Sequence, residues 1–211
     1  MSLASFCAAL GLGGDPEAVL EPLDRFYADV DDRLAAATVH LNLPCAEGCD
    51  GCCHEAVFLS APEMLAVGRE LLDWPKEELR GVLDAMSGLA RRFEDELELL
   101  EELEPGAERD EVAARIKFSC PMLGSDGRCR VYGGRELNAR TFGQSRDALR
   151  GEPYGCELSH ARLKVLGPEP LAQLPDARAL RAELRDRVPG VGEVRVFPWW
   201  LARFGASLLA P

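Results

Sequence analysis

Apolar residues recur at the three- and four-residue spacing of an amphipathic helix along much of the chain. The first such stretch follows Asp15-Pro16-Glu17, a typical helix start with an N-cap aspartate, an early proline and an acidic first turn. Its periodic apolar positions are Val19, Leu20, Leu23, Phe26, Tyr27, Val30 and Leu34. The pattern predicts a helix from Pro16 to about His40, before Pro44 and a glycine-containing segment break regular structure.

Further helical patterns follow. Ser60 and Glu63 have the spacing of a capping box, which predicts a second helix through Leu72. The remaining helices are predicted over residues 75–103, 108–117 and 169–188. We therefore expect a mainly α-helical protein.

Two stretches leave room for a protein partner. Residues 94–104 are strongly acidic, and Leu97, Leu99, Leu100 and Leu103 are expected to form the packing side of that helix. The acidic side fits either a solvated helix face or an acidic docking surface. The aromatic tail over residues 194–204 is expected to pack on the core, with partner binding as the alternative.

Residues 120–132 have the pattern of a small β-hairpin that turns within residues 125–127. In the expected register Cys129 faces Met122, and Cys120 lies two residues further along the same face. The diagonal separation of the two cysteines would be about 7–8 Å between α-carbons. Both thiols would then reach one metal ion or cluster.

Length and composition place the chain among globular proteins. We expect a single domain over residues 1–211, with irregular cysteine-bearing loops and one short β-hairpin around a metal site. No apolar run approaches the roughly 20 residues of a membrane-spanning helix. The start lacks the basic residues of a signal peptide, so a cytoplasmic location is expected. In that compartment eight cysteines serve more often as metal ligands or reduced thiols than as disulfides.

The net charge of −12 argues against a general nucleic-acid-binding protein. The charge is uneven, because residues 114–150 hold eight Arg and Lys against three Asp and Glu. This basic segment contains the second pair of cysteines. Nearby cations favour the deprotonated thiolate that binds metals.

Four cysteines fall within nine residues, at positions 45, 49, 52 and 53, and Cys120 and Cys129 follow later. Packing gives cysteines no reason to cluster, whereas a thiophilic metal needs several sulfurs at one point. Gly48 and Gly51 permit the tight turns found in zinc knuckles and iron–sulfur loops. The adjacent Cys52 and Cys53 are expected to point in different directions and not to bind the same single ion.

The cysteine block ending C-x2-C-C, the apolar stretch over residues 57–63 and the segment from Cys120 to Arg135 resemble one known family. It is the CxxCxxCC family of zinc- or iron-chelating proteins, or YkgJ-type cysteine cluster proteins, which includes relatives of flagellin lysine N-methylase. The resemblance covers a cysteine cluster core over about residues 42–145 and leaves a helical, aromatic C-terminal extension over about 165–211. It implies a metal site more directly than a reaction.

The chain departs from the family pattern at Ala139, where relatives have a cysteine. Cys156 could supply the missing ligand, with His160 on the same helix face, or the site could hold fewer metals or none. The candidate metal ligands are Cys45, Cys49, Cys52, Cys53, Cys120, Cys129 and Cys156. Cys7 is interpreted as a core residue, and His54 is expected to project away from the cluster.

Several basic side chains near the second cysteine pair have two interpretations. Two roles at the site are open for Arg128, Arg130, Arg135 and Arg140, namely donating to thiolates or holding an anionic substrate. The alternative is pairing with the acidic remainder of the chain. Tyr132 is expected to pack in the apolar shell of the site.

The expected cofactor is an iron–sulfur cluster or zinc, with a slight preference for iron–sulfur because the candidate thiols exceed the demand of one site. The function predicted first is a cytoplasmic metal-binding protein whose centre is structural or redox-active, without assigned catalysis. One alternative is a protein-modifying enzyme related to flagellin lysine N-methylase. The chain lacks the glycine motif of a Rossmann-type methyltransferase. Its C-x3-C-x2-C spacing matches that of radical S-adenosylmethionine enzymes, but the match is weak evidence outside an α/β barrel. The other alternative is an adaptor or chaperone. No nucleic-acid or membrane partner is expected.

Overall fold

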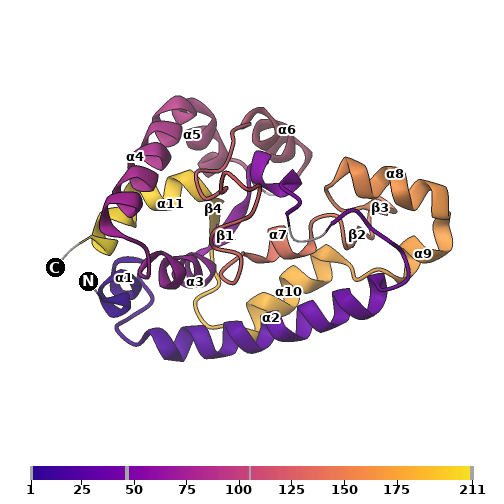
Figure 1. Ribbon diagram of the computed structural model, residues 1–211, viewed down its shortest axis with the longest axis horizontal. Coiled ribbons are helices and arrows are strands. Elements are labelled where there is room, and N and C mark those ends of the chain that lie inside the picture. Colours follow the sequence, from indigo (N-terminus) through magenta and orange to yellow (C-terminus); the bar gives the residue numbers. More distant parts are fainter. Residues whose placement is uncertain (1, 46–47, 105, 210–211) are drawn as a thin grey trace.

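The computed structural model describes residues 2–45, 48–104 and 106–209. Within these residues the protein is mainly helical, as predicted, with 60% helix (Figure 1). The helices are α1 (Leu3–Ala9), α2 (Pro16–Thr38), α3 (Ala61–Leu71), α4 (Lys76–Arg92), α5 (Glu94–Glu102), α6 (Ala107–Arg115), α7 (Leu137–Thr141), α8 (Glu157–Leu166), α9 (Pro168–Gln173), α10 (Ala177–Arg187) and α11 (Phe197–Phe204). Two short 3-10 helices are η1 (Gly51–His54) and η2 (Gly205–Leu208).

Two small antiparallel sheets, which the sequence pattern did not predict, connect distant parts of the chain. The strands are β1 (Phe58–Ser60), β2 (Arg146–Asp147), β3 (Glu152–Pro153) and β4 (Val194–Val196). Strand β1 pairs with β4, with Leu59 opposite Arg195, and β2 pairs with β3. The first pairing brings the C-terminal region beside the segment that follows the cysteine block.

Helix α2 confirms the first helical prediction. The Asp15 side chain accepts a hydrogen bond from the Glu17 amide at 3.1 Å, and the helix ends at Thr38, two residues before the expected position. All seven predicted apolar positions are buried in the main core. Figure 1 shows α2 along one long edge of the molecule, with α10 beside it.

Helix α3 confirms the capping box. The Glu63 side chain accepts hydrogen bonds from the Ser60 amide and hydroxyl at 2.7 and 2.8 Å. Both residues are fully buried. Glu63 is therefore a core carboxylate, and its oxygens also accept hydrogen bonds from Leu137 and Arg181.

The prediction of one helix over residues 75–103 is wrong. Phe93 leaves the helical conformation, and it separates α4 from α5. Its ring packs against Phe118 with 6.3 Å between ring centroids, in a second small hydrophobic cluster. Leu99 was expected on the packing side but is 39% exposed, whereas Leu97 and Leu100, which share one helix face, are buried.

The prediction of one helix over residues 169–188 is also wrong. Helix α9 ends at Gln173, since Pro175 disfavours the helical conformation at the residue before it. Asp176 then begins α10 by accepting a hydrogen bond from the Arg178 amide at 3.2 Å.

The expected hairpin is reduced to one isolated antiparallel bridge. The Gly127 amide donates to the Gly124 carbonyl at 3.0 Å, which places the turn where it was predicted. However, Cys129 pairs with Leu123 and not with Met122. The register is shifted by one residue, because a five-residue loop with Gly127 at a φ of +76° replaces a regular two-residue hairpin turn.

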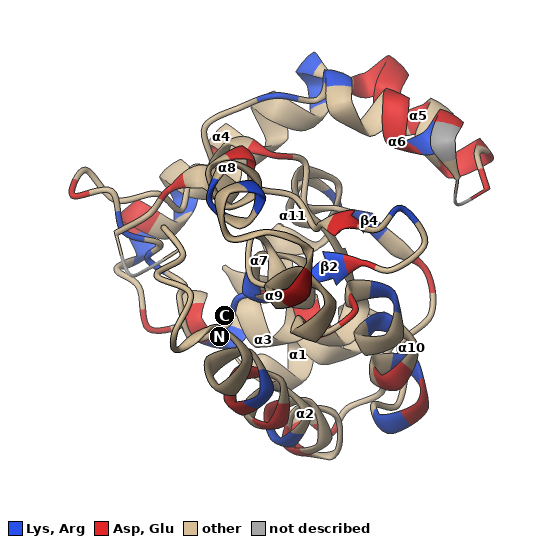
Figure 2. Ribbon diagram, turned by 90° about the vertical axis from the view of Figure 1, so that its right-hand side faces the viewer, with Lys and Arg blue, Asp and Glu red and all other residues tan. Residues whose placement is uncertain are grey.

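The aromatic tail packs on the core, as expected. Helix α11 lies against α4, and Trp200 is only 6% exposed. The Trp200 indole donates to the Leu59 carbonyl at 2.9 Å. The acidic side chains of α5 remain on the outside, where Figure 2 shows them together on one side of the molecule. None of the helices in the described residues has the length and apolar character required to cross a membrane.

Candidate metal centre

Seven of the eight cysteines line two adjoining cavities. The first cavity has a volume of about 110 Å³ and is lined by Cys45, Cys49, Cys52, Cys53, Cys129 and Cys156. The second has a volume of about 50 Å³ and is lined by Cys52, Cys53, Cys120 and Cys129. The structure thus brings together all seven cysteines that the sequence analysis selected. Cys7 lies apart in α1, fully buried in the core as predicted.

The first cysteine block reaches the cavities through the short helix η1, which carries Cys52 and Cys53. Its partner segment is attached directly to it, because the Cys120 amide donates to the Cys53 carbonyl at 2.8 Å. Gly48 has a φ of +91°, a conformation that favours glycine. Residues 46 and 47 of the block lie outside the described residues.

Cys156 comes from a separate part of the chain, at the N-terminus of α8. A Cβ atom on Gly51 would lie 3.8 Å from the Cys49 sulfur and 3.9 Å from the Cys156 sulfur. Both sulfurs therefore lie close to the same glycine. On the other side Gly143, with a φ of +77°, leaves space for Cys156, since a Cβ there would lie 3.0 Å from the Cys156 Cβ.

The two histidines near the cysteines line neither cavity. The His160 ring nitrogen Nε2 lies 2.6 Å from the Pro153 carbonyl oxygen, with which it forms a hydrogen bond. The His54 ring is hydrogen-bonded to Asp50 and to Ser119, at 3.2 Å in both cases. His54 thus lies away from the cavities, as expected, and His160 is not positioned as a substitute ligand.

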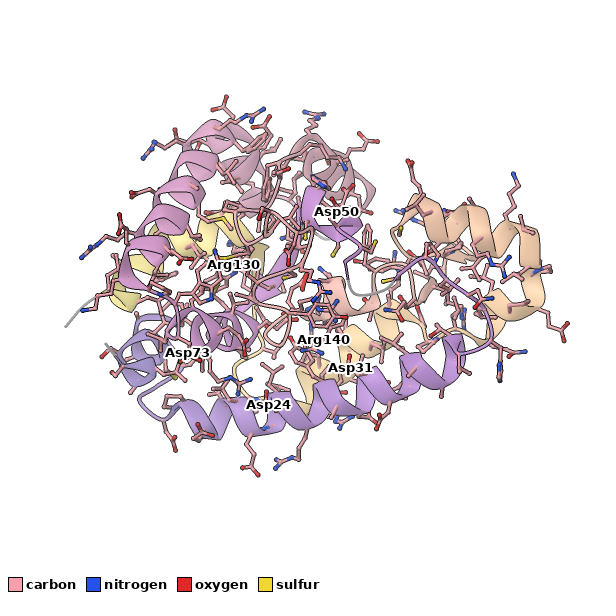
Figure 3. The ribbon with its side chains drawn as sticks, in the orientation of Figure 1. Asp24, Asp31, Asp50, Asp73, Arg130 and Arg140 are labelled. Atoms are coloured by element: carbon pink, nitrogen blue, oxygen red, sulfur yellow. The ribbon has the colours of Figure 1, made fainter. Side chains whose placement is uncertain are left out.

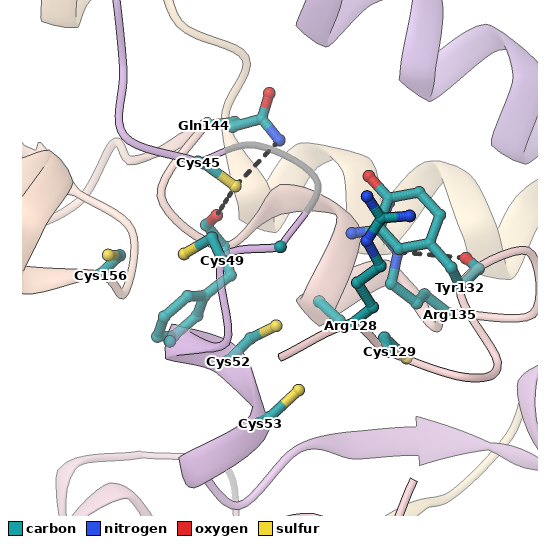
Figure 4. Close-up of a pocket in the computed structure, with 14 residues that line it drawn as sticks. Cys45, Cys49, Cys52, Cys53, Arg128, Cys129, Tyr132, Arg135, Gln144 and Cys156 are labelled. Carbon is teal, nitrogen blue, oxygen red and sulfur yellow. Dashed lines mark hydrogen bonds between the residues drawn. The ribbon is translucent and has the colours of Figure 1, made fainter. Parts of the chain in front are cut away.

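The side chains of the adjacent Cys52 and Cys53 do not point as the sequence analysis expected. Figure 4 shows the Cys52 and Cys53 sulfurs both pointing toward the side where Cys129 lies, whereas the Cys49 sulfur points toward Cys156. The Cys52 and Cys53 side chains are hydrogen-bonded to each other. Both residues line both cavities, so the expectation that they point in different directions is wrong.

Burial raises the pKa of several of these thiols further above neutral pH. It raises the pKa of Cys45 and of Cys129, and it raises the pKa of Cys120 to about 12. The hydrogen bond with Cys53, followed by burial, raises the pKa of Cys52. Because metals bind thiolates, metal binding at this site would release protons.

Basic and polar side chains beside the cavities oppose this rise in the pKa of the thiols. The Arg135 guanidinium acts to lower the pKa of Cys45, Cys52 and Cys129. Burial outweighs it at Cys45 and Cys129, and the hydrogen bond with Cys53 together with burial outweighs it at Cys52. The Arg135 carbon Cζ lies 3.4 Å from the centre of the Tyr132 ring, and its Nε donates to the Tyr132 carbonyl. Gln144 donates to the Cys45 sulfur at 3.4 Å (Figure 4).

Of the four arginines selected from the sequence, two pair with acidic residues and two lie at the thiol site. Arg130 pairs with Glu78, and Arg140 pairs with Asp31 at 2.6 Å (Figure 3), so these two offset acidic residues. Arg128 and Arg135 line the first cavity. Tyr132 also lines it but is 45% exposed, and its expected place in an apolar shell is therefore wrong.

A buried polar group under the second cavity was missed by the sequence analysis. Arg181 donates to Glu63 at 3.0 Å, and the Leu137 amide donates to Glu63 at 2.9 Å. Glu136 lines the second cavity and accepts from the Ala139 amide at 2.9 Å. Burial, together with the nearby Glu63, raises the pKa of Glu136 to about 7. The only sequence signal for this group was the capping-box role of Glu63.

The donor set fits a thiophilic group, but its spacing does not fit one closed zinc ion. Zinc–sulfur bonds of about 2.3 Å in a tetrahedron require sulfurs roughly 3.8 Å apart. No group of three or more described His, Cys, Asp and Glu residues is placed to hold an ion in this way. The first cavity is also larger than an ion requires, since a single water occupies roughly 10–15 Å³ on the same measure.

Comparison of the chain with family models, with curated proteins and with solved structures finds no match. The resemblance to the CxxCxxCC family therefore stays a prediction from the motifs. Ala139, where that resemblance implies a missing cysteine, lines both cavities.

Proposed function

We propose that this protein is a cytoplasmic metal-binding protein whose clustered cysteines hold an iron–sulfur cluster or zinc, with a cluster favoured. The observation that carries the proposal is the lining of two adjoining cavities by seven cysteines from three separate parts of the chain. The ligands would come from Cys45, Cys49, Cys52, Cys53, Cys120, Cys129 and Cys156.

Two other uses of clustered cysteines have less support. All eight cysteines are free thiols, which argues against a disulfide scaffold. Nucleophilic or redox-sensing cysteines have a lowered pKa, whereas burial raises the pKa of Cys45, Cys120 and Cys129. Neutral, buried thiols that converge from distant segments are better explained as ligands that lose their protons to a metal.

The spacing of the thiols favours a group larger than one ion. The described residues hold no three side chains at single-ion distances, and the first cavity holds about 110 Å³. An iron–sulfur cluster is bound by about four thiolates around a larger body. When bound, a cluster would supply one-electron transfer, whereas zinc would act as a structural cross-link.

Anaerobic purification followed by iron, zinc and sulfide analysis and a visible spectrum tests the proposal. Iron with matching acid-labile sulfide and broad visible absorption supports the cluster. Colourless protein with bound zinc supports a structural metal. Protein that contains neither metal, and that takes up neither during anaerobic reconstitution, contradicts the proposal.

Substitutions locate the ligands. Cys49→Ser and Cys129→Ser should each lower the metal content, because both thiols line the first cavity. Cys7→Ser is the matched control, since Cys7 is a buried cysteine far from both cavities, and its metal content should equal that of the wild type. If Cys156→Ser behaves like Cys7→Ser, Cys156 is not a ligand.

A further inference from the structure

The two cavities form one continuous site, because five residues line both of them. Three are the thiols Cys52, Cys53 and Cys129, and the other two are Arg135 and Ala139. We call these five residues the shared wall. Ala139 has no donor atom, and an arginine stays protonated and cannot bind a metal. Part of the shared wall therefore offers a cation and no further metal ligand.

The loop that carries Arg135 is held by buried interactions. Arg140, which is 7% exposed, donates from Nε to the Arg135 carbonyl at 2.8 Å and is itself paired with Asp31 of α2 at 2.6 Å. A Cβ atom on the buried Gly134 would lie 2.8 Å from the Ala66 carbonyl oxygen, so the loop packs directly on α3. The backbone of Arg135 is thus positioned by α2 and α3, independently of the cysteines.

The Arg135 side chain is oriented as well, but its two terminal nitrogens are not used. The guanidinium stacks on the Tyr132 ring, and its Nε donates to the Tyr132 carbonyl at 3.2 Å (Figure 4). These two contacts fix the plane and the rotation of the guanidinium. No described residue accepts a hydrogen bond from the terminal nitrogens. Two donor groups are therefore held in place without an acceptor.

Among the described residues, no carboxylate pairs with Arg135. Glu136 is adjacent in the sequence, but both of its oxygens accept from the Ala139 amide, at 2.9 and 3.1 Å. By contrast, Arg130 and Arg140 both form ion pairs with carboxylates. Arg135 thus brings an unpaired, forked cation to the shared wall.

We propose that Arg135 holds the carboxylate of a small ligand on the shared wall, beside the metal group that the cysteines bind. The inference rests on the proposed function, because it places the ligand next to that group. The fork of a guanidinium matches the two oxygens and the single charge of a carboxylate. Tyr132, at the edge of the first cavity, is 45% exposed, so the ligand reaches Arg135 from solution.

A different role for Arg135, as a counter-charge for metal-bound thiolates, predicts a different result for one variant. Arg135→Lys keeps the positive charge but lacks the planar fork, whereas Arg135→Gln loses the charge as well. A counter-charge would be retained in Arg135→Lys. Binding of a carboxylate by the fork would be weakened in both variants.

Fluorine NMR with fluoroacetate tests the carboxylate site. The protein is reconstituted anaerobically with iron and sulfide, or with Co²⁺, its metal content is measured, and fluoroacetate is titrated into it. We expect saturable broadening of the fluorine signal. Arg135→Gln should raise the Kd about tenfold, as expected for the loss of one charge-assisted hydrogen bond. Arg135→Lys should also raise it, because the fork is lost.

Arg130→Gln is the matched control, because Arg130 pairs with Glu78 and lines neither cavity, and its Kd should equal that of the wild type. A comparison with metal-free protein locates the probe. Iron or cobalt should broaden the signal of the bound probe further, because unpaired electrons beside the probe speed its relaxation. Circular dichroism checks that each variant has folded.

Three results overturn the inference and leave the proposed metal binding intact. They are no saturable binding by metal-loaded protein, a wild-type Kd in Arg135→Gln or Arg135→Lys, and no additional broadening by the metal. Tighter binding of methylphosphonate, measured by competition, would overturn the carboxylate as the ligand class. Protein that takes up no metal contradicts the proposed function, and the placement of the ligand beside a metal is then wrong as well.

Discussion

Helix α2 and the cysteine-bearing helix η1 owe their positions to different interactions. Helix α2 spans 23 residues, begins at a side-chain cap and buries seven apolar side chains that its own sequence spacing places on one face. Helix η1 has four residues, has no side-chain cap and is tied to its partner segment by the hydrogen bond between the Cys53 carbonyl and the Cys120 amide.

This difference separates stability from metal binding. The core around α2 is stabilised by apolar burial, which requires no ligand. The cysteine region instead gathers neutral thiols around cavities, and its strongest potential cross-link is a metal. The following changes test how independent the two regions are, in order of decreasing expected effect.

The largest effect is expected from Phe26→Ala in α2. Phe26 is fully buried, so its truncation should lower the free energy of unfolding by about 3–5 kcal/mol. Urea unfolding of the metal-free protein measures this loss. Val39→Ala, at an exposed position just after α2, is the control and should change stability by less than about 0.5 kcal/mol. A loss of metal per folded chain in Phe26→Ala would show that the two regions are not independent.

Glu63→Gln tests the connection between the regions. It should cost about 3 kcal/mol, because Arg181 would lose its charged partner in a buried position. Metal affinity should also fall, since Glu63 accepts from the first amide of α7, the helix that carries Ala139 to both cavities. Unfolding and metal titration of the same samples measure both effects. Glu17→Gln, at an exposed site in α2, should change neither by more than a few tenths of a kcal/mol. An unchanged metal affinity in Glu63→Gln would contradict the connection.

Metal removal should loosen the cysteine region alone. With metal at 100 times its dissociation constant, binding stabilises the bound state by about 2.7 kcal/mol. Chelation should therefore speed hydrogen exchange of the Cys120 amide about a hundredfold if that amide is exposed only when the site opens. Amides in the middle of α2 serve as internal controls and should change much less. Equal acceleration in both regions would mean that they open together.

The stability of the metal-free protein should depend on pH in part through the titration of Glu136. Its folded-state pKa of about 7 lies above the ordinary 4.5, so its neutral form stabilises the fold below pH 4.5 and the stabilisation disappears as pH rises through 7. Between pH 5 and pH 7 this loss amounts to about 2 kcal/mol. Glu136→Gln should remove that part of the slope in unfolding experiments. Identical slopes in the two proteins would contradict a raised pKa.

The smallest expected differences in stability come from two glycine substitutions, one at the site and one in α4. Gly143→Ala should cost about 1 kcal/mol or more, because φ is +77° and the new Cβ would crowd Cys156 and Ser159. Gly81→Ala in α4 meets no atom within 4 Å and should stabilise the helix by about 0.5–1 kcal/mol. Thermal unfolding and cadmium binding distinguish them, since only Gly143→Ala should weaken the metal site. Equal metal binding in both variants would contradict the role of Gly143.

The sequence predicted local features better than their positions relative to each other. The start of α2, the capping box of α3 and the turn near Gly127 all depend on residues within a few positions of one another. The helix break at Phe93 and the shifted pairing of Cys129 with Leu123 depend on partners elsewhere in the fold or on loop geometry. Propensity and spacing contain no information about such partners.

The candidate site shows the same division. Cysteine density alone selected the seven thiols, because no packing requirement explains their clustering. Only the tertiary structure placed Cys156 beside Cys49, excluded His160 as a ligand and revealed the buried carboxylates of Glu63 and Glu136. It also paired Glu63 with Arg181. The sequence by itself thus determined the start of α2, the capping box of α3 and the choice of candidate thiols, since these follow from neighbouring residues. The convergence of the seven thiols on two adjoining cavities was decided by the fold, because it depends on where distant segments bring their side chains.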